Sequence, residues 1–364
     1  MFRRILLMLH RWLGLAASLP LVLLGVSGAI IVFEDEFDRA LNAPLRSVNP
    51  AGERQSWQTL VDLARQEGAG DAQAIRLPTA DDQSAEVAFK GGRLIYIDPY
   101  SGCVLGSRLR SQILLGRIHQ FHTKLLVGRD GSLVMGVCSL LLVLLSLSGL
   151  VLWWRTKVWS LPVRLGTKRW NFDVHSALGL YALLFWLVLG ASGAFMTFPG
   201  ISHPATYWLT RSEPVEPPRI ESSDAAGRER ISIDDVLTRS QRELPEAAVT
   251  AISFPQQAAD VFLVFLKYPE DRTPAGRSRI YIDAYSGEIL WTTDARSAPL
   301  GTWLINHNRP LHTGDLWGWP SRILMGLASL LLPLQIYTGA VLWWRGRRIR
   351  RKLPNAQPAT RDEL

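Results

Sequence analysis

The chain has 364 residues, of which 48% are hydrophobic and 20% charged, and its formal net charge is +8. These figures alone would suit two or three soluble domains or a basic nucleic-acid-binding protein. The distribution of charge argues against both, because four stretches lack Asp, Glu, Lys and Arg over the roughly 20 residues that a helix needs to cross a bilayer. The stretches 12–33, 131–154, 174–198 and 323–344 therefore predict four transmembrane helices.

Basic residues gather in the short segments beside the predicted spans. Segments 1–11, 155–173 and 345–364 hold 15 of the 40 basic residues but only three of the 32 acidic ones. Short basic segments stay in the cytoplasm, so both termini are expected inside a bacterial inner membrane and both long segments in the periplasm. The partner expected for these basic residues is membrane lipid and not nucleic acid. An acidic Glu34-Asp-Glu follows the first apolar run where a signal peptide would have its cleavage site, so that run is expected to be retained as a span.

The chain is an internal repeat, which organises every other signal. At an offset of 165, His10-Arg-Trp-Leu-Gly-Leu recurs as His175-Ser-Ala-Leu-Gly-Leu. At an offset of 190, His122 recurs as His312, and the Trp-Trp-Arg at 153–155 recurs at 343–345. The outer segments repeat as well, since Tyr-Ile-Asp-Pro-Tyr-Ser-Gly at 96–102 returns as Tyr-Ile-Asp-Ala-Tyr-Ser-Gly at 281–287.

Each outer segment predicts a small α+β domain. The repeated motif places a strand before a Ser-Gly turn and a second strand after it, as in a hairpin. An amphipathic helix is predicted ahead of each hairpin, near 57–66 and 233–242, and linkers near 214–218 and 222–227. The first half is predicted to comprise the N-terminus and first span (1–33), the first periplasmic domain (34–110), an interfacial segment (111–130) and the second span (131–154). A cytoplasmic loop (155–173) joins it to the second half. The second half comprises the third span (174–198), the second periplasmic domain (199–302), a second interfacial segment (303–322), the fourth span (323–344) and a basic tail (345–364).

Paired hairpins joined to spans that begin His-x-x-Leu-Gly-Leu and end Trp-Trp-Arg resemble the PepSY-associated transmembrane family. The Asn171-Phe-Asp-Val-His175 before the third span is also similar to that family's signature. The expected fold is therefore a membrane protein with a duplicated four-helix transmembrane bundle and two periplasmic PepSY-like α+β domains. Some members resemble FoxB-type reductases of ferric siderophores, described as binding haem within the bundle, and this resemblance implies a haem-dependent ferric-siderophore reductase.

Four of the seven histidines lie at repeated positions. In the expected topology, His10 and His175 lie at the cytoplasmic end of the bundle, and His122 and His312 at the periplasmic end. Neutral imidazoles are axial ligands of haem iron, and helical bundles build such sites from facing side chains. A single histidine at a helix end usually only contacts headgroups, but two repeated pairs at matching depth predict two haem b groups, each held between two histidines.

The position of the outer histidine pair follows less directly from the sequence than that of the inner pair. A straight helix would place His122 about 13 Å outside the second span, whereas Gly128-Arg-Asp-Gly131 predicts a break. An apolar helix near 111–126 would then return His122 to the bundle. His119 and His307 are substitutes for His122 and His312, and His203 is expected at the surface.

Two further signals each have two explanations. Repeated glycines would clear room for a flat macrocycle or serve ordinary helix packing, and the sequence does not separate these readings. Arginines near the proposed ligands could pair with haem propionates, although membrane topology and headgroup contact explain them better. The glycines are Gly14, Gly25, Gly28, Gly149, Gly179, Gly190, Gly193 and Gly339, and the arginines are Arg11, Arg129 and Arg309.

The expected function is transmembrane electron transfer. An unidentified cytoplasmic or quinol donor would supply the inner haem, and the outer haem would pass electrons to a ferric siderophore held by the periplasmic domains, releasing iron as Fe(II). One macrocycle cannot bridge a hydrocarbon core of about 30 Å, so two are expected. The rivals are a haem-free regulatory or scaffold protein whose PepSY-like domains bind a peptidase or envelope partner, and a quinol-linked cytochrome with another periplasmic acceptor.

Overall fold

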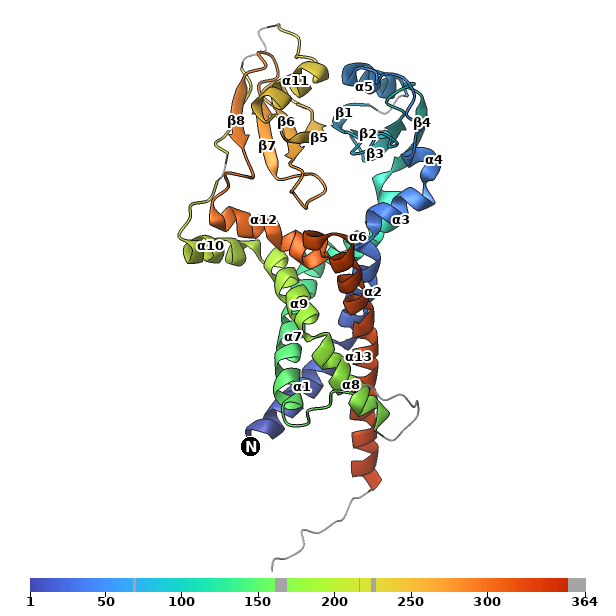
Figure 1. Ribbon diagram of the computed structural model, residues 1–364, viewed down its shortest axis with the longest axis vertical. Coiled ribbons are helices and arrows are strands. Elements are labelled where there is room, and N and C mark those ends of the chain that lie inside the picture. Colours follow the sequence, from blue (N-terminus) through green and yellow to red (C-terminus); the bar gives the residue numbers. More distant parts are fainter. Residues whose placement is uncertain (68–69, 161–168, 216, 224–226, 353–364) are drawn as a thin grey trace, which may run out of the picture. The chain divides into compact units, whose positions relative to one another are not determined.

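The computed structural model describes residues 1–67, 70–160, 169–215, 217–223 and 227–352. Parts of the predicted loop 155–173, of both linkers and of the tail 345–364 therefore lie outside the described residues. The chain divides into two compact units (Figure 1). The helical unit comprises 1–32, 121–197 and 322–364, and the sheet unit comprises 33–120 and 198–321.

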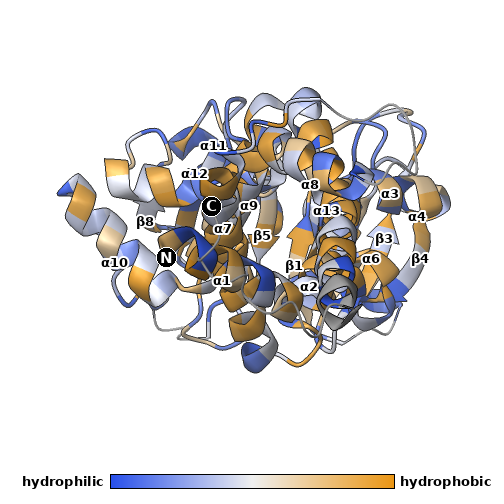
Figure 2. Cartoon of the chain, turned by 90° about the horizontal axis from the view of Figure 1, so that it is seen from below, coloured by the Kyte–Doolittle hydropathy of each residue, from blue (hydrophilic) through white to orange (hydrophobic). Residues whose placement is uncertain are grey.

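The helical unit contains two long apolar helices and two bent pairs of shorter ones. The long helices are α7 (Arg129–Trp153) and α13 (Trp319–Lys352), and both are long and apolar enough to cross a membrane. Large apolar side chains are exposed along α7 at helical spacing, for example Leu133, Val137 and Leu144. In Figure 2 α13 is likewise mostly hydrophobic. Apolar surface of this extent suits lipid better than water.

The first and third predicted spans are each broken, which the sequence did not predict. They are α1 (Phe2–Ala16) with α2 (Ser18–Ile31), bent by 61°, and α8 (Trp170–Tyr181) with α9 (Leu183–Thr197), bent by 62°. Pro20 disfavours a straight helix at the first break, because its ring would clash with the carbonyl of Ala16. Phe185 stands at the matching position of the second half, so proline alone does not explain the bend.

One core joins the four predicted spans. Both break residues, Ala17 and Ala182, are buried in it beside Leu142 of α7 and Leu332 of α13. The indole N–H of Trp186 in α9 donates to the carbonyl of Ala328 at 2.9 Å. The breaks are therefore packed features of the interior. That each bent pair crosses the membrane once is a prediction that length and composition allow.

The sheet unit holds one antiparallel sheet of eight strands in the order β4-β3-β2-β1-β5-β6-β7-β8. Each half of the repeat supplies four strands, and β1 pairs with β5 at the join, with Ile75 opposite Ile252. The sequence predicted two α+β segments but gave no sign that their sheets would be continuous. The strands are β1 (Ala72–Arg76), β2 (Ala85–Phe89), β3 (Arg93–Ile97), β4 (Val104–Leu109), β5 (Ala248–Ser253), β6 (Phe262–Lys267), β7 (Ser278–Ile282) and β8 (Ile289–Thr293).

The predicted amphipathic helices are confirmed as α5 (Trp57–Gln66) and α11 (Ile233–Glu243). Serine caps begin both, because the hydroxyl oxygens of Ser56 and Ser232 accept backbone N–H bonds from the first helical turn. The carboxylate of Asp234 accepts bonds from the N–H groups of Trp57 and Gln58 at 2.9 and 3.0 Å. Both helices bury their apolar faces on one surface of the sheet, so the two halves share a single core.

The predicted hairpins and the predicted break after His122 are confirmed too. The repeated motif joins β3 to β4 and β7 to β8. Helix α6 (Leu114–Lys124) ends before α7 begins at Arg129. In the second half, α12 (Leu300–Thr313) and the short η2 (Asp315–Trp317) precede α13. The remaining helices are α3 (Glu34–Leu41), α4 (Ala43–Arg46), η1 (Arg110–Gln112) and α10 (Pro199–Thr210).

Candidate functional site

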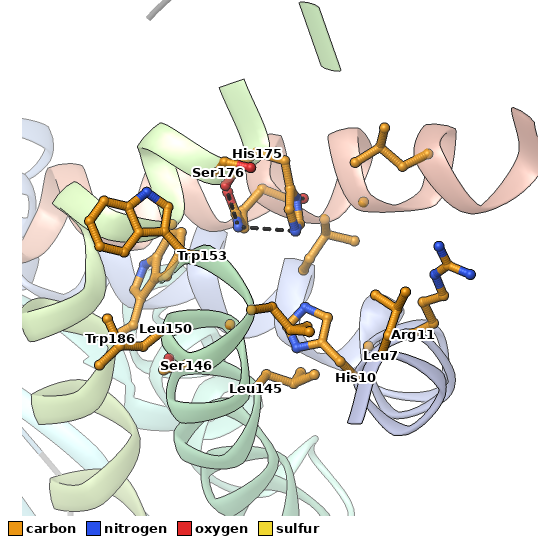
Figure 3. A pocket seen from close by; sticks show the side chains of 18 of the residues that line it. Leu7, His10, Arg11, Leu145, Ser146, Leu150, Trp153, His175, Ser176 and Trp186 are labelled. Atoms are coloured by element: carbon orange, nitrogen blue, oxygen red, sulfur yellow. Dashed lines mark hydrogen bonds between the residues drawn. The ribbon is translucent and has the colours of Figure 1, made fainter. Parts of the chain in front are cut away.

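A cavity of about 370 Å³ lies inside the helical unit. Its lining comes from α1, α2, α7, α8, α9 and α13, and it is mostly apolar. His10 of α1 and His175 of α8 point into it from different helices (Figure 3). Their ring centroids are 6.4 Å apart, and the ring planes are nearly perpendicular at 86°. The structure thus brings together the inner histidine pair that the repeat predicted.

Hydrogen bonding orients the imidazole of His10. Its Nδ1 lies 2.8 Å from the hydroxyl oxygen of Ser148 on α7. That hydroxyl donates its own proton to the carbonyl of Leu145 at 3.1 Å, so Nδ1 of His10 is the donor in their contact. A neutral His10 therefore carries its proton on Nδ1, and the lone pair of Nε2 is left for a ligand.

His175 is held in the same way by α13. Its Nδ1 lies 3.1 Å from the carbonyl oxygen of Gln335 and 3.1 Å from the hydroxyl oxygen of Thr338. A carbonyl only accepts, so Nδ1 must be the donor, and Nε2 again keeps its lone pair. The side-chain amide of Gln335 lies 3.5 Å from this Nε2, at the outer limit of a hydrogen bond. Its contact is weak and would have to yield to a metal.

Four of the repeated glycines divide into two groups by what lies next to them. A Cβ on Gly149 would lie 3.5 Å from Cε1 of His10, and one on Gly339 would lie 3.1 Å from Cε1 of His175. These two glycines leave room for the imidazoles. A Cβ on Gly25 or Gly190 would instead meet the backbone of a neighbouring helix, at 2.6 and 2.9 Å. That second pair serves close helix packing.

The cavity residues fit a haem held between two imidazoles. A metal–imidazole bond of about 2 Å, with the nitrogen about 1.1 Å from its ring centre, places two axial rings about 6 Å apart, close to the 6.4 Å observed. Within the described residues no group of three or more His, Cys, Asp or Glu could hold a metal ion. Axial ligation of haem requires only two side chains, because the macrocycle supplies the other ligands.

Two buried oxygen atoms in the cavity lining have no hydrogen-bond partner in the part of the chain that the structure describes. They are the hydroxyl oxygen of Ser146 and the side-chain carbonyl oxygen of Gln335. Ser146 is only 8% exposed. Unpaired buried polar atoms are uncommon in folded proteins and call for a specific explanation, and here both belong to residues that line the cavity. The lining therefore combines many apolar side chains with a few polar groups, as ligand pockets do.

His122 is placed by the first half of the chain. Its Nδ1 lies 2.9 Å from the hydroxyl oxygen of Ser27 in α2, and a Cβ on Gly28 would lie 3.0 Å from its Cε1. His122 therefore does return to the helices from which the break separates it. His312 lies in α12 of the sheet unit, and the pairing of His122 with His312 stays a prediction.

The other candidate residues lie as follows. His119 contacts the carboxylate of Glu34 through Nδ1 at 2.7 Å, and His307 donates from Nδ1 to the carbonyl of Trp303 at 2.8 Å. His203, expected at the surface, is half-buried in α10. Arg11 borders the cavity, but its side chain points away from both imidazoles in Figure 3. Arg129 is exposed at the start of α7, and Arg309 is half-buried in α12.

Sequence reasoning missed the residues that orient the histidines. Ser148 and Thr338 occupy matching positions at the offset of 190, each directly before a repeated glycine. That hydroxyl-glycine pair was a usable signal, because it repeats together with the histidines. Gln335 was not predictable in this way, since Leu145 stands at its position in the first half.

Apolar spans around a cavity with two opposed imidazoles define a membrane protein with a candidate cofactor site inside its helical unit. Residues 7–346 match the model of the PepSY-associated TM region. The chain belongs to that family. No protein with a curated description matches it significantly.

Proposed function

We propose that the chain is an inner-membrane di-haem b-type cytochrome that passes electrons from the cytoplasmic side to a ferric siderophore in the periplasm. The observation that carries this proposal is the opposition of His10 and His175 across one cavity, each with Nδ1 occupied by a partner. The proposed arrangement is a duplicated four-helix transmembrane bundle with both termini in the cytoplasm and two PepSY-like domains in the periplasm. His122 and His312 would hold the second haem, and a quinol or cytoplasmic carrier would be the electron donor.

The residues of the inner site would hold and insulate a haem. His10 and His175 would hold the haem iron through their imidazole nitrogens, and Ser148 and Thr338 would fix the imidazole orientations. Bound haem would supply a one-electron Fe(III)/Fe(II) couple. A haem held by both imidazoles would relay electrons and would not bind oxygen. The mostly apolar lining would limit the contact of this couple with water.

Iron release follows from ligand preference. Siderophores with hard oxygen donors bind the harder ferric ion tightly, and reduction to Fe(II) lowers their affinity for the iron. The proposed reaction therefore needs one electron per ferric chelate and no covalent step on the protein.

The decisive experiment is a haem spectrum and haem stoichiometry of the purified, full-length protein. We expect Soret and α bands that dithionite sharpens, and two haems per chain. His10→Ala and His175→Ala should each leave one haem, since each removes one axial ligand of the same group. His203→Ala, which also removes one imidazole, should keep both.

A folded protein that stays colourless when supplied with haem would exclude the cytochrome. The chain would then be a haem-free membrane protein whose outer domains bind a peptidase or another envelope partner. If haem binds but ferric siderophores do not oxidise the reduced protein, the acceptor is another periplasmic molecule.

A further inference from the structure

The surface of the sheet that faces away from α5 and α11 is packed differently in the two halves of the repeat. In the first half α4 packs directly on β4, and a Cβ on Gly106 would lie 2.7 Å from Cδ2 of Leu45. Arg108 donates to the carboxylate of Asp38 in α3 at 2.8 and 3.0 Å and to the hydroxyl of Tyr96 at 2.6 Å. Tyr96 is fully buried. This half of the surface is closed by its own helices.

The second half carries larger and charged residues at the matching positions. Along the repeated hairpin, Arg279 takes the position of Leu94, Tyr281 that of Tyr96, and Trp291 that of Gly106. Strand pairing sets Tyr281 between Leu263 and Trp291 on one surface of the sheet. These side chains are only half-buried. Among the described residues no helix packs on them as closely as α4 packs on the first half.

Phe265 extends this aromatic area toward a group of arginines. It pairs with Arg279 in the sheet, and the guanidinium of Arg279 lies 5.0 Å from the centre of its ring. Arg279 also donates to the carbonyl of Arg277 at 3.2 Å. Arg277 in turn donates to the carbonyl of Asn306 in α12 at 3.3 Å, and Arg309 lies on the next turn of that helix.

The three arginines Arg277, Arg279 and Arg309 form no ion pair among the described residues. Burial lowers the pKa of Arg277, Asp271 raises it, and the charges of Arg279 and Arg309 lower it further. Nε of Arg277 and Oδ2 of Asp271 are both buried without a partner. The charged neighbours of Arg277 are thus one carboxylate and two further guanidinium groups, an excess of positive charge that favours an anionic ligand.

We propose that this second-half surface, formed by Phe265, Tyr281 and Trp291 with Arg277, Arg279 and Arg309, binds an anionic metal chelate that bears aromatic rings, such as a tris-catecholate. The inference rests on the proposed function, because the chelate would be the ferric substrate. Its aryl rings stack on the aromatic side chains, and its phenolate oxygens accept charge-assisted bonds from the guanidinium groups. A chelate without charge or without rings uses only half of this surface.

The test is a calorimetric titration of the full-length protein in detergent with the gallium complex of a synthetic tris-catecholate. Gallium(III) is not reduced, so binding is measured apart from electron transfer. We expect binding, with an about ten-fold loss of affinity in Arg279→Leu and in Trp291→Gly. Both variants restore the residue type that the first half has at the same position. Arg242→Leu, which removes an exposed charge from α11 on the other surface, should change affinity less than about two-fold.

Three results would overturn the proposal. The first is equal affinity of Arg279→Leu and the unchanged protein, and the second is equal binding of an uncharged gallium trihydroxamate. The third is displacement by millimolar inorganic phosphate, which would assign the arginines to phosphate or lipid headgroups. Binding of the gallium complex by a protein that holds no haem would support the surface and reject the cytochrome, so the two proposals fail separately.

Discussion

The cavity and the sheet are both built from the two halves of the repeat, but the halves agree at the cavity and differ on the sheet. His10 is oriented by Ser148 and given room by Gly149, just as His175 is oriented by Thr338 and given room by Gly339. On the sheet, the position that is Gly106 in one half is Trp291 in the other. Matching parts meet across a shared space at the cavity, whereas each half of the sheet surface has its own neighbours. The repeat is therefore most informative where both copies serve one site.

The largest loss of stability is expected from Asp38→Asn, which disrupts the contacts of α3 with the first half of the sheet. The carboxylate accepts two bonds from Arg108 and lies 3.5 Å from Arg46. Both Asp38 and Arg108 are largely buried, so loss of the charge leaves a buried cation and should cost about 3–5 kcal/mol of unfolding free energy. Chemical denaturation of the full chain measures it.

The matched control for this prediction is Asp81→Asn. That carboxylate meets Arg54 at 2.6 Å, but it is 81% exposed. An exposed pair contributes less than about 1 kcal/mol. Similar losses in the two variants would show that the buried cluster does not hold α3 on the sheet.

A smaller effect, with a defined pH dependence, is expected from Asp283→Asn in the second hairpin. Burial alone would raise the pKa of Asp283, but N–H groups of Ser223, Ser286 and Tyr285 hold it well below its usual value. A depressed pKa in the folded state contributes stability that is present above the unfolded pKa and is lost as pH falls. We expect a cost of about 2 kcal/mol at pH 7 that shrinks below about pH 4.

Asp98→Asn makes the same change in the first hairpin. Asp98 is half-exposed, and the bonds that its carboxylate accepts from described residues come from its own turn, including those from the Tyr100 N–H and the Ser101 hydroxyl. We expect less than half the cost of Asp283→Asn, measured by denaturation across the same pH range. A cost for Asp283→Asn that does not change with pH would rule out the ionised carboxylate as its source.

Gly339→Ala and Gly149→Ala compare the two sides of the cavity. The added Cβ would lie 3.1 Å from His175 but 3.5 Å from His10. Gly339→Ala should therefore displace an imidazole and weaken haem binding about ten-fold, as overpacking costs roughly 1–3 kcal/mol. The Cβ of Gly149→Ala would make ordinary van der Waals contact, so this variant should change haem binding little. Haem titration checks both, and a reversed order would contradict the geometry.

The smallest effect concerns Gln335, which is polar in one half of the repeat only. Gln335 presents its amide to Nε2 of His175, while Leu145 stands at the matching position near His10. Gln335→Leu gives this position the residue type of the other half and removes a weak competitor, so haem affinity should rise about two- to five-fold. Leu145→Gln is the reciprocal variant and should lower it. If Gln335→Leu instead bound haem less tightly, the amide of Gln335 would support haem binding and not compete with it.

Short sequence patterns were enough to predict the hairpins and the helices α5 and α11. A strand, a Ser-Gly turn and a second strand specify a hairpin with little help from the rest of the chain. The pairing of β1 with β5 was not predictable, because strand edges carry no sequence mark of their partner. The bends at Ala17 and Ala182 were missed because an apolar run of span length reads as one helix, and only the first break contains a proline.

The candidate site was predictable where the repeat supplied evidence. His10 and His175 stood out because each begins the same motif, and the structure places them 6.4 Å apart between ring centroids. Gln335 and Ser146 could not be found, since each is polar in one half only and its meaning depends on side chains from other helices. Among the outer histidines, His122 and His312 were preferred because they lie at repeated positions. The predicted break after His122 is present in the structure.

The seam between β1 and β5 has a consequence for any attempt to divide the molecule. Only three residue pairs join the two halves along this seam. Cutting there would leave each fragment with a bare strand edge, whose open N–H and C=O groups are a template for another chain. Separately expressed halves should therefore self-associate edge to edge, and mixing them should restore the mixed pair at the expense of both homodimers.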